Sequence, residues 1–222
     1  MPTSLRAVLF DLDGTLIDTA PDFAYVIDVM RKRRDLPSIP YHSVRETVSD
    51  GARGLVKMAF ALPEDHAEFE PLRQEMLALY RQHLADNSRP FDGMEDVLRA
   101  IEARGLHWGV VTNKPLAYAE PLMQALALHE RCGALICPDH VKERKPHPES
   151  LQLACAQLGC QIGEAIFIGD HRRDIEAGKN AAMPTVACAY GYVHAEDPCE
   201  RWGADFIVQQ VGDLLPLLHK MY

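Results

Sequence analysis

The sequence predicts an α/β protein built on a doubly wound parallel sheet, with a helical segment inserted after the first strand. The apolar run Ala7-Val8-Leu9-Phe10 predicts a short buried strand. Residues 18–88 show helical periodicity, and from residue 94 onward helical segments alternate with short apolar runs. Alternation of this kind is typical of parallel strands that are connected by helices on both faces of a sheet.

The inserted segment is predicted to be helical because apolar residues recur at the spacing i, i+3, i+4 and i+7 over residues 23–30, and much the same over residues 72–80. Residues 89–93, Arg-Pro-Phe-Asp-Gly, predict a hinge that returns the chain to the sheet, and the partner hinge is expected near residues 16–20. We therefore expect residues 1–17 and 89–222 to form the core and residues 18–88 the insertion.

The second half of the chain supplies the remaining elements. Helices are predicted over residues 94–104, 117–128, 148–158 and 174–182. Strands are predicted over residues 107–112, 134–137, 165–168, 184–188 and 206–208, and a final apolar helix over residues 211–219. Strands that end in polar residues would place a site at the carboxyl edge of the sheet, where doubly wound folds bind ligands.

Composition limits the possible functions. The 222 residues are 47% hydrophobic and 25% charged, and no apolar run approaches the roughly 20 residues needed to cross a bilayer, so no membrane span is expected. The net charge of −9 argues against a nucleic-acid partner. The first apolar strand is too short for a secretory signal, so we expect a cytoplasmic protein. Both a monomer and a dimer are compatible with the sequence.

The sequence Asp11-Leu12-Asp13-Gly14-Thr15 directly follows the first predicted strand. Residues i and i+2 of an extended chain point the same way, so Asp11 and Asp13 could reach one small substrate together. Taken alone, Asp and Gly after a strand are ordinary turn residues. Further polar signals follow the later apolar runs, namely Thr112-Asn113, Lys145-Pro146, and Gly169-Asp170 with Asp174.

With these four motifs in this order, nearly the whole chain resembles the haloacid dehalogenase superfamily of aspartate-dependent phosphohydrolases. The resemblance implies a Rossmann-like core, and it makes the inserted helices a small mobile cap that closes over the sheet edge. It also implies that Asp11 is a nucleophile forming an aspartyl-phosphate, and that Asp13 is the general acid and then the general base.

The other motif residues receive supporting roles from the same resemblance. Thr112 and Asn113 would bind a transferring phosphoryl oxygen, and Lys145 would neutralise the phosphoryl group and Asp11. Without the resemblance, a threonine after a strand is an ordinary β-former or helix cap, and most lysines are solvated surface residues.

The resemblance also implies one metal ion. Mg²⁺ prefers carboxylates, water and substrate phosphate, and we expect Asp11 and Asp170 to supply carboxylates and Asp13 a backbone carbonyl. Asp174 would support the site from behind these ligands, or would act only as a helix N-terminal residue that favours the macrodipole. His171, at the position after Asp170 where relatives often carry a small residue, is expected to be an ordinary loop residue, with contact to substrate or metal-bound water as the alternative.

Substrate choice is expected to depend on the cap. Its candidate loop is residues 48–54, in which Ser49 and Gly51 would contact the substrate and Arg53 would bind a carboxylate. An ordinary helix junction, with Arg53 in solvent, is the alternative. The chain looks most like the phosphoglycolate phosphatase branch, through residues 108–115, 135–142, 190–192 and 202–205.

The resemblance implies a small-molecule phosphate ester as substrate. Within the branch, the likeness is strongest to phosphatases of N-acetylmuramic acid 6-phosphate, which serve cell-wall sugar recycling. Phosphoglycolate is the alternative substrate, since it also carries both a phosphate and a carboxylate. Other sugar phosphatases, a phosphomutase and a non-catalytic interaction module are more distant possibilities.

Overall fold

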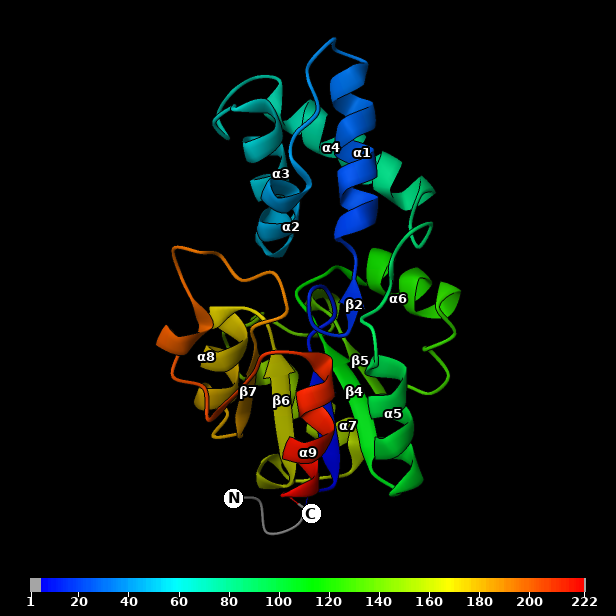
Figure 1. The fold of residues 1–222 in the computed structure, drawn as a ribbon, viewed down its shortest axis with the longest axis vertical. Coiled ribbons are helices and arrows are strands. Elements are labelled where there is room, and N and C mark those ends of the chain that lie inside the picture. The colour runs from blue at the N-terminus through cyan, green and yellow to red at the C-terminus, as the bar shows by residue number, and fades with distance from the viewer. Residues whose placement is uncertain (1–4, 222) are drawn as a thin grey trace.

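The computed structural model describes residues 5–221, and within them six parallel strands form one sheet (Figure 1). The strand order is β5-β4-β1-β6-β7-β8, so the first strand of the chain lies in the middle of the sheet. The strands are β1 (Ala7–Phe10), β4 (His107–Val111), β5 (Ala134–Ile136), β6 (Ala165–Gly169), β7 (Thr185–Cys188) and β8 (Phe206–Val208). The predicted doubly wound parallel sheet is confirmed.

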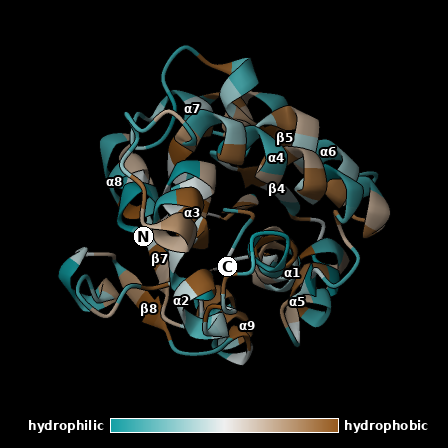
Figure 2. Ribbon diagram, turned by 90° about the horizontal axis from the view of Figure 1, so that it is seen from above, coloured by the Kyte–Doolittle hydropathy of each residue, from teal (hydrophilic) through white to brown (hydrophobic). Residues whose placement is uncertain are grey.

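Helices cover both faces of this sheet. They are α5 (Met94–Ala103), α6 (Leu116–Ala125), α7 (Glu149–Leu158), α8 (Arg172–Asn180) and α9 (Leu214–His219). The last predicted helix begins as a 3₁₀ turn, Val211–Asp213, before α9 starts. In Figure 2 the helices carry hydrophilic and hydrophobic residues along their length, as amphipathic helices on a sheet do.

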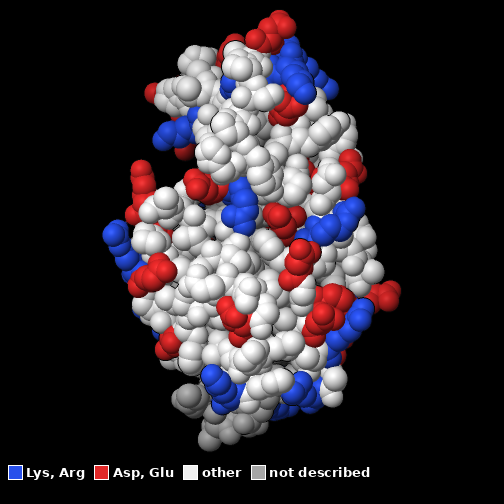
Figure 3. Space-filling view, viewed as in Figure 1, with Lys and Arg blue, Asp and Glu red and all other residues white. Residues whose placement is uncertain are grey.

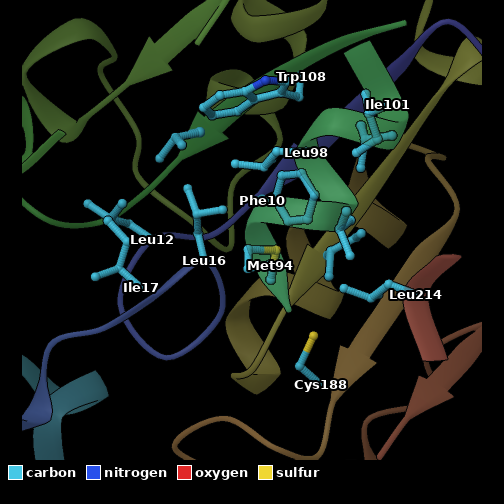
Figure 4. Packing of buried hydrophobic residues seen from close by; sticks show 14 of the residues in the cluster. Phe10, Leu12, Leu16, Ile17, Met94, Leu98, Ile101, Trp108, Cys188 and Leu214 are labelled. Carbon is cyan, nitrogen blue, oxygen red and sulfur yellow. The ribbon is translucent and has the colours of Figure 1, made fainter. Parts of the chain in front are cut away.

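Strand β1 is buried on both faces, and its side chains alternate between two apolar clusters. Val8 and Phe10 pack with α5, α6 and α9, whereas Ala7 and Leu9 pack with α7 and α8. Figure 4 shows the first cluster, in which Phe10 lies among Leu98, Ile101, Trp108 and Leu214. Because both faces of β1 are packed, the end of the strand has a fixed position. The residues that directly follow it are therefore fixed in position as well.

The cap is formed by four helices between β1 and β4, and it lies above the carboxyl edge of the sheet (Figure 1). The helices are α1 (Ala20–Lys32), α2 (Tyr41–Thr47), α3 (Gly51–Phe60) and α4 (Phe69–Gln82). They share an apolar cluster of their own, which includes Phe23, Leu55, Phe69 and Tyr80. Tyr192 is the buried residue that the core contributes to this cluster.

The two chain crossings between core and cap lie side by side. The strands β2 (Ile17–Asp18) and β3 (Arg89–Pro90) pair antiparallel at the two positions where hinges were predicted. Asp22, which is fully buried in the first turn of α1, accepts hydrogen bonds from the backbone N–H groups of Asn87 (2.8 Å) and Ser88 (3.0 Å). Its carboxylate thus joins the incoming and outgoing segments.

The charged surface is mixed. On the face shown in Figure 3, acidic and basic side chains of the described residues are interspersed, with no extended basic patch. None of the helices within residues 5–221 is long and apolar enough to cross a membrane.

We expect Asp22→Ala to lower the free energy of unfolding by at least about 2 kcal/mol, because it leaves the backbone N–H and the hydroxyl of the fully buried Ser88 without their acceptor, at about 1–3 kcal/mol each. Urea unfolding measures the change. The control is Asp28→Ala on the same helix, which removes an exposed pair with Lys32 and should cost at most about 1 kcal/mol. Equal losses in the two variants would show that Asp22 does not join the two crossings.

Candidate active site

The four predicted motifs meet at one edge of the sheet because the strands that precede three of them are neighbours. Strand β1, which precedes Asp11, lies between β4, which precedes Thr112, and β6, which precedes Asp170. All three strands are parallel, so their carboxyl ends point the same way. Asp11, Asp13, Thr112, Asn113 and Lys145 line one cavity of about 600 Å³ between core and cap.

Three carboxylates form a cluster at the sheet edge. One oxygen from each of Asp11, Asp170 and Asp174 lies within 4.8 Å of the others, and Asp170 and Asp174 are fully buried. The two oxygens of Asp170 accept hydrogen bonds from the Thr15 hydroxyl (2.7 Å) and the Tyr192 backbone N–H (2.8 Å). Both donors are neutral, so they orient the carboxylate of Asp170 without cancelling its charge.

Lys145 compensates part of this charge. Its ammonium lies 2.9 Å from Oδ1 of Asp11 and 2.8 Å from Oδ1 of Asp174, and it donates to the carbonyl of Val111 at 2.7 Å. Burial by itself would lower the pKa of Lys145, but the attraction of Asp11 and Asp174 outweighs it and raises the pKa. Lys145 is therefore a permanent cation in contact with the predicted nucleophile.

The carboxylates retain an excess of negative charge. Burial, with the nearby charges of Asp11 and Asp174, raises the pKa of Asp170 to about 8. Burial also raises the pKa of Asp11 to about 6, against the lowering effect of Lys145. Three clustered carboxylates that one lysine only partly neutralises, all with oxygen donors, fit a hard divalent cation such as Mg²⁺. Asp11 and Asp170 are the residues that would hold it.

Asp174 combines the two roles that its position allowed. It lies in the first turn of α8, where Oδ2 accepts a hydrogen bond from the backbone N–H of His171 at 3.0 Å. The backbone N–H of Arg173 in turn donates to Nδ1 of His171 at 3.1 Å. Its other oxygen pairs with Lys145. Asp174 thus caps the N-terminus of α8 and pairs with Lys145. His171 is the N-cap residue of α8 and also lines the cavity.

Thr112 and Asn113 shape the loop that follows β4. The Thr112 hydroxyl accepts a hydrogen bond from the backbone N–H of Lys114 at 3.0 Å. The Asn113 amide donates to the backbone carbonyl of Lys145 at 3.1 Å, so it ties the loops of the second and third motifs together.

Asp13 does not join the carboxylate cluster with its side chain. Its Oδ1 accepts a hydrogen bond from Thr19 Oγ1 at 2.6 Å and lies 2.9 Å from the ammonium of Lys114. Asp13 also lines the cavity, and its side chain is 17% exposed. Sequence reasoning did not single out Lys114, although it directly follows Asn113 in the second motif.

The predicted cap loop over residues 48–54 is wrong as a loop. It consists of a 3₁₀ turn, Val48–Asp50, followed by the start of α3 at Gly51, whose φ of +69° favours glycine. Ser49, Gly51 and Arg53 nevertheless line the cavity. The guanidinium of Arg53 pairs with Glu64 at 2.6 Å, and its side chain is 57% exposed. The structure therefore leaves Arg53 near the cavity but engaged with a solvent-exposed partner.

Residues 8–188 match the family model of haloacid dehalogenase-like hydrolases, and the chain belongs to this family. It is 52% identical over 216 residues to the N-acetylmuramic acid 6-phosphate phosphatase of Pseudomonas aeruginosa, covering 97% of this chain and 96% of that protein. It is 42% identical over 209 residues to a phosphoglycolate phosphatase of Xanthomonas campestris, with 94% of each chain covered. A crystal structure titled as that of a predicted phosphoglycolate phosphatase from Haemophilus somnus matches with a TM-score of 0.84 at 28% identity, covering 97% of this chain and 99% of that one. The matches confirm the resemblance and the predicted enzyme class, a phosphoric monoester hydrolase.

We expect Mg²⁺ binding to release a proton at pH 7, because Asp170, whose pKa is about 8 without metal, must ionise to become a ligand. The affinity for Mg²⁺ should therefore rise from about pH 6 to about pH 8. Calorimetry in buffers of different ionisation enthalpy counts the released protons.

Asp170→Asn should weaken Mg²⁺ binding and remove most of this proton release. The control is Asp197→Asn, which changes a carboxylate paired with Arg172 outside the cluster and should do neither. An affinity that does not change with pH would contradict the assignment of Asp170.

Proposed function

We propose that this enzyme is a Mg²⁺-dependent phosphatase that hydrolyses N-acetylmuramic acid 6-phosphate through an aspartyl-phosphate on Asp11, in the cytoplasm and in the recycling of cell-wall sugars. The observation that carries the proposal is the position of the Asp11 carboxylate. It lines the cavity, touches Lys145 and lies in one cluster with Asp170 and Asp174.

The reaction has two steps at phosphorus. A carboxylate oxygen of Asp11 attacks, the bond from phosphorus to the sugar oxygen breaks, and Asp13 gives that oxygen a proton. Asp13 then takes a proton from water, which attacks the aspartyl-phosphate and releases inorganic phosphate. Lys145 compensates the negative charge at Asp11, and Thr112 with Asn113 would bind a phosphoryl oxygen. Bound Mg²⁺ would bring phosphate and carboxylate together by neutralising their charges.

The size and lining of the cavity favour a sugar acid. A volume of about 600 Å³ exceeds what a two-carbon acid occupies and lies within the range of pockets for larger ligands. Its wall includes the rings of Phe23, Tyr80 and Tyr118, which suit the apolar faces of a pyranose and an acetyl group. Besides Lys114 and Lys145, the cations that line it are Arg53, Arg73, Arg144 and Arg173. Phosphoglycolate is the second candidate substrate, because a relative named phosphoglycolate phosphatase is 42% identical to this chain.

A panel of phosphate esters with Mg²⁺ tests the proposal. We expect kcat/KM for N-acetylmuramic acid 6-phosphate to exceed that for phosphoglycolate, and Asp11→Asn to fold normally and lose turnover. Mass spectrometry after trapping with fluoroberyllate, a mimic of aspartyl-phosphate, should place the adduct on Asp11. Hydrolysis by the Asn variant at a substantial rate, or an adduct on another residue, would contradict the assignment of the nucleophile.

Arg53 is proposed to pair with the lactyl carboxylate of the substrate, in exchange for Glu64. An exposed ion pair is worth about 0–1 kcal/mol, so the exchange costs little. Arg53→Ala should lower kcat/KM for N-acetylmuramic acid 6-phosphate roughly ten- to a hundred-fold more than for N-acetylglucosamine 6-phosphate, which lacks that carboxylate. Glu64→Gln, the control, should not reduce this preference. If Arg53→Ala affects both substrates equally, Arg53 does not recognise the carboxylate.

A further inference from the structure

Lys114 has an unusual environment for a lysine of a loop after a strand. Its side chain is 6% exposed, and its ammonium donates hydrogen bonds to Oδ1 of Asp13 and to the Tyr80 hydroxyl, both at 2.9 Å. The ammonium also lies 4.7 Å from the centre of the Tyr80 ring and 5.2 Å from that of Phe23. A core residue is thus inserted into an aromatic pocket of the cap.

The pocket is itself well ordered by packing. Phe23 on α1 and Tyr80 on α4 stack at 4.0 Å between ring centres, with 9° between the ring planes. Tyr80 is 1% exposed, so it has little freedom to turn away. Burying an ammonium is costly unless it is paired and hydrogen-bonded, and here a carboxylate, a hydroxyl and two ring faces supply that compensation. Both the ammonium and the backbone of Lys114 are therefore held in place.

The same contacts restrict Asp13. Both of its side-chain contacts, from Lys114 and from the Thr19 hydroxyl, are made to Oδ1. Thr19 is the residue that precedes α1, so each partner of Oδ1 is tied to the cap or its hinge. With Oδ1 held from two sides, the rotation of the carboxylate is limited and Oδ2 is the oxygen left for a substrate in the cavity.

We propose that Lys114 is a positioning residue for Asp13, which orients the carboxylate toward the oxygen of the leaving group when the cap residues Tyr80 and Phe23 hold the ammonium in place. The inference rests on the proposed function, because it assumes that Asp13 protonates that oxygen. It extends the function to a residue outside the four motifs, and it makes the acid step depend on a contact between core and cap.

Two other roles of Lys114 lead to different kinetics. A lysine that binds an anionic group of the substrate would act independently of Asp13 and would matter for any leaving group. A lysine that only joins core and cap would lower stability and reduce all activities together. A positioning residue acts through Asp13, so its loss matters only where Asp13 contributes.

The test is a double-mutant cycle with two leaving groups, measured as kcat/KM. Lys114→Met should slow the hydrolysis of N-acetylmuramic acid 6-phosphate roughly ten- to a hundred-fold, a part of the about 10²- to 10⁴-fold that a general acid contributes. It should slow 4-nitrophenyl phosphate, whose leaving group needs no proton, by less than about three-fold. In the Asp13→Asn background, Lys114→Met should cause no further loss on the sugar phosphate.

Two further variants complete the experiment. Tyr80→Phe removes only the hydroxyl that accepts from Lys114, and it should give a smaller loss, about two- to ten-fold, with the same dependence on the leaving group. It keeps the inference testable if Lys114→Met does not fold. Lys179→Met is the matched control, because this lysine donates to the Trp202 carbonyl at 3.0 Å outside the cavity and should leave both rates unchanged.

The outcomes separate the inference from the proposed function. If Asp13→Asn depends on the leaving group but Lys114→Met slows both substrates equally, or multiplies with Asp13→Asn, the role of Lys114 is overturned and the phosphatase mechanism stands. If Asp13→Asn itself slows both substrates equally, the acid role of Asp13 fails and the inference fails with it.

Discussion

The structure depends on one electrostatic constraint, which is the gathering of three carboxylates at the edge of the sheet, two of which pair with a single lysine. Like charges at this separation in a buried site repel strongly, so they persist only with fixed compensation. Lys145 provides it by pairing with Asp11 and Asp174, while neutral donors orient Asp170. The backbone at Gly14 packs closely against Asp170, since a Cβ on Gly14 would lie 2.1 Å from an oxygen of that carboxylate. Burial, with the charges of Asp11 and Asp174, raises the pKa of Asp170 to about 8, so a cation beside it would favour its ionised form.

The two aspartates of the first motif differ in their ion-pair partners. Asp11 pairs with Lys145 and belongs to the cluster of the core, whereas Asp13 pairs with Lys114 and is tied to the cap and its hinge. In the proposed mechanism Asp11 has to stay ionised in a rigid position, and Asp13 has to face the oxygen of the leaving group. The chain thus gives each aspartate a lysine partner of its own.

Much of the core could be predicted because its signals are local. Short apolar runs, helical periodicity and the polar residues after each strand give the sheet, the order of the elements and the motif residues that line the cavity. Contacts between distant segments have no such signal, so nothing in the sequence indicates the hydrogen bonds of Thr15 and Tyr192 to Asp170. The two-residue strands β2 and β3 are too short to show a period. Residues 48–54 are predicted as a substrate-binding loop whose two glycines permit close backbone approach, whereas they form a 3₁₀ turn and the start of α3.

Tyr192 shows why the cap is attached where it is. Its backbone N–H holds Asp170, and its hydroxyl accepts hydrogen bonds from the backbone N–H groups of Thr19 (2.7 Å) and Ala20 (2.9 Å) while donating to Asp18 (2.6 Å). One buried residue therefore holds a carboxylate of the cluster and the first turn of the first cap helix. Because the hinge and the cluster share this support, the insertion begins within a few residues of Asp11, while Tyr192 of the core keeps the carboxylate of Asp170 in place.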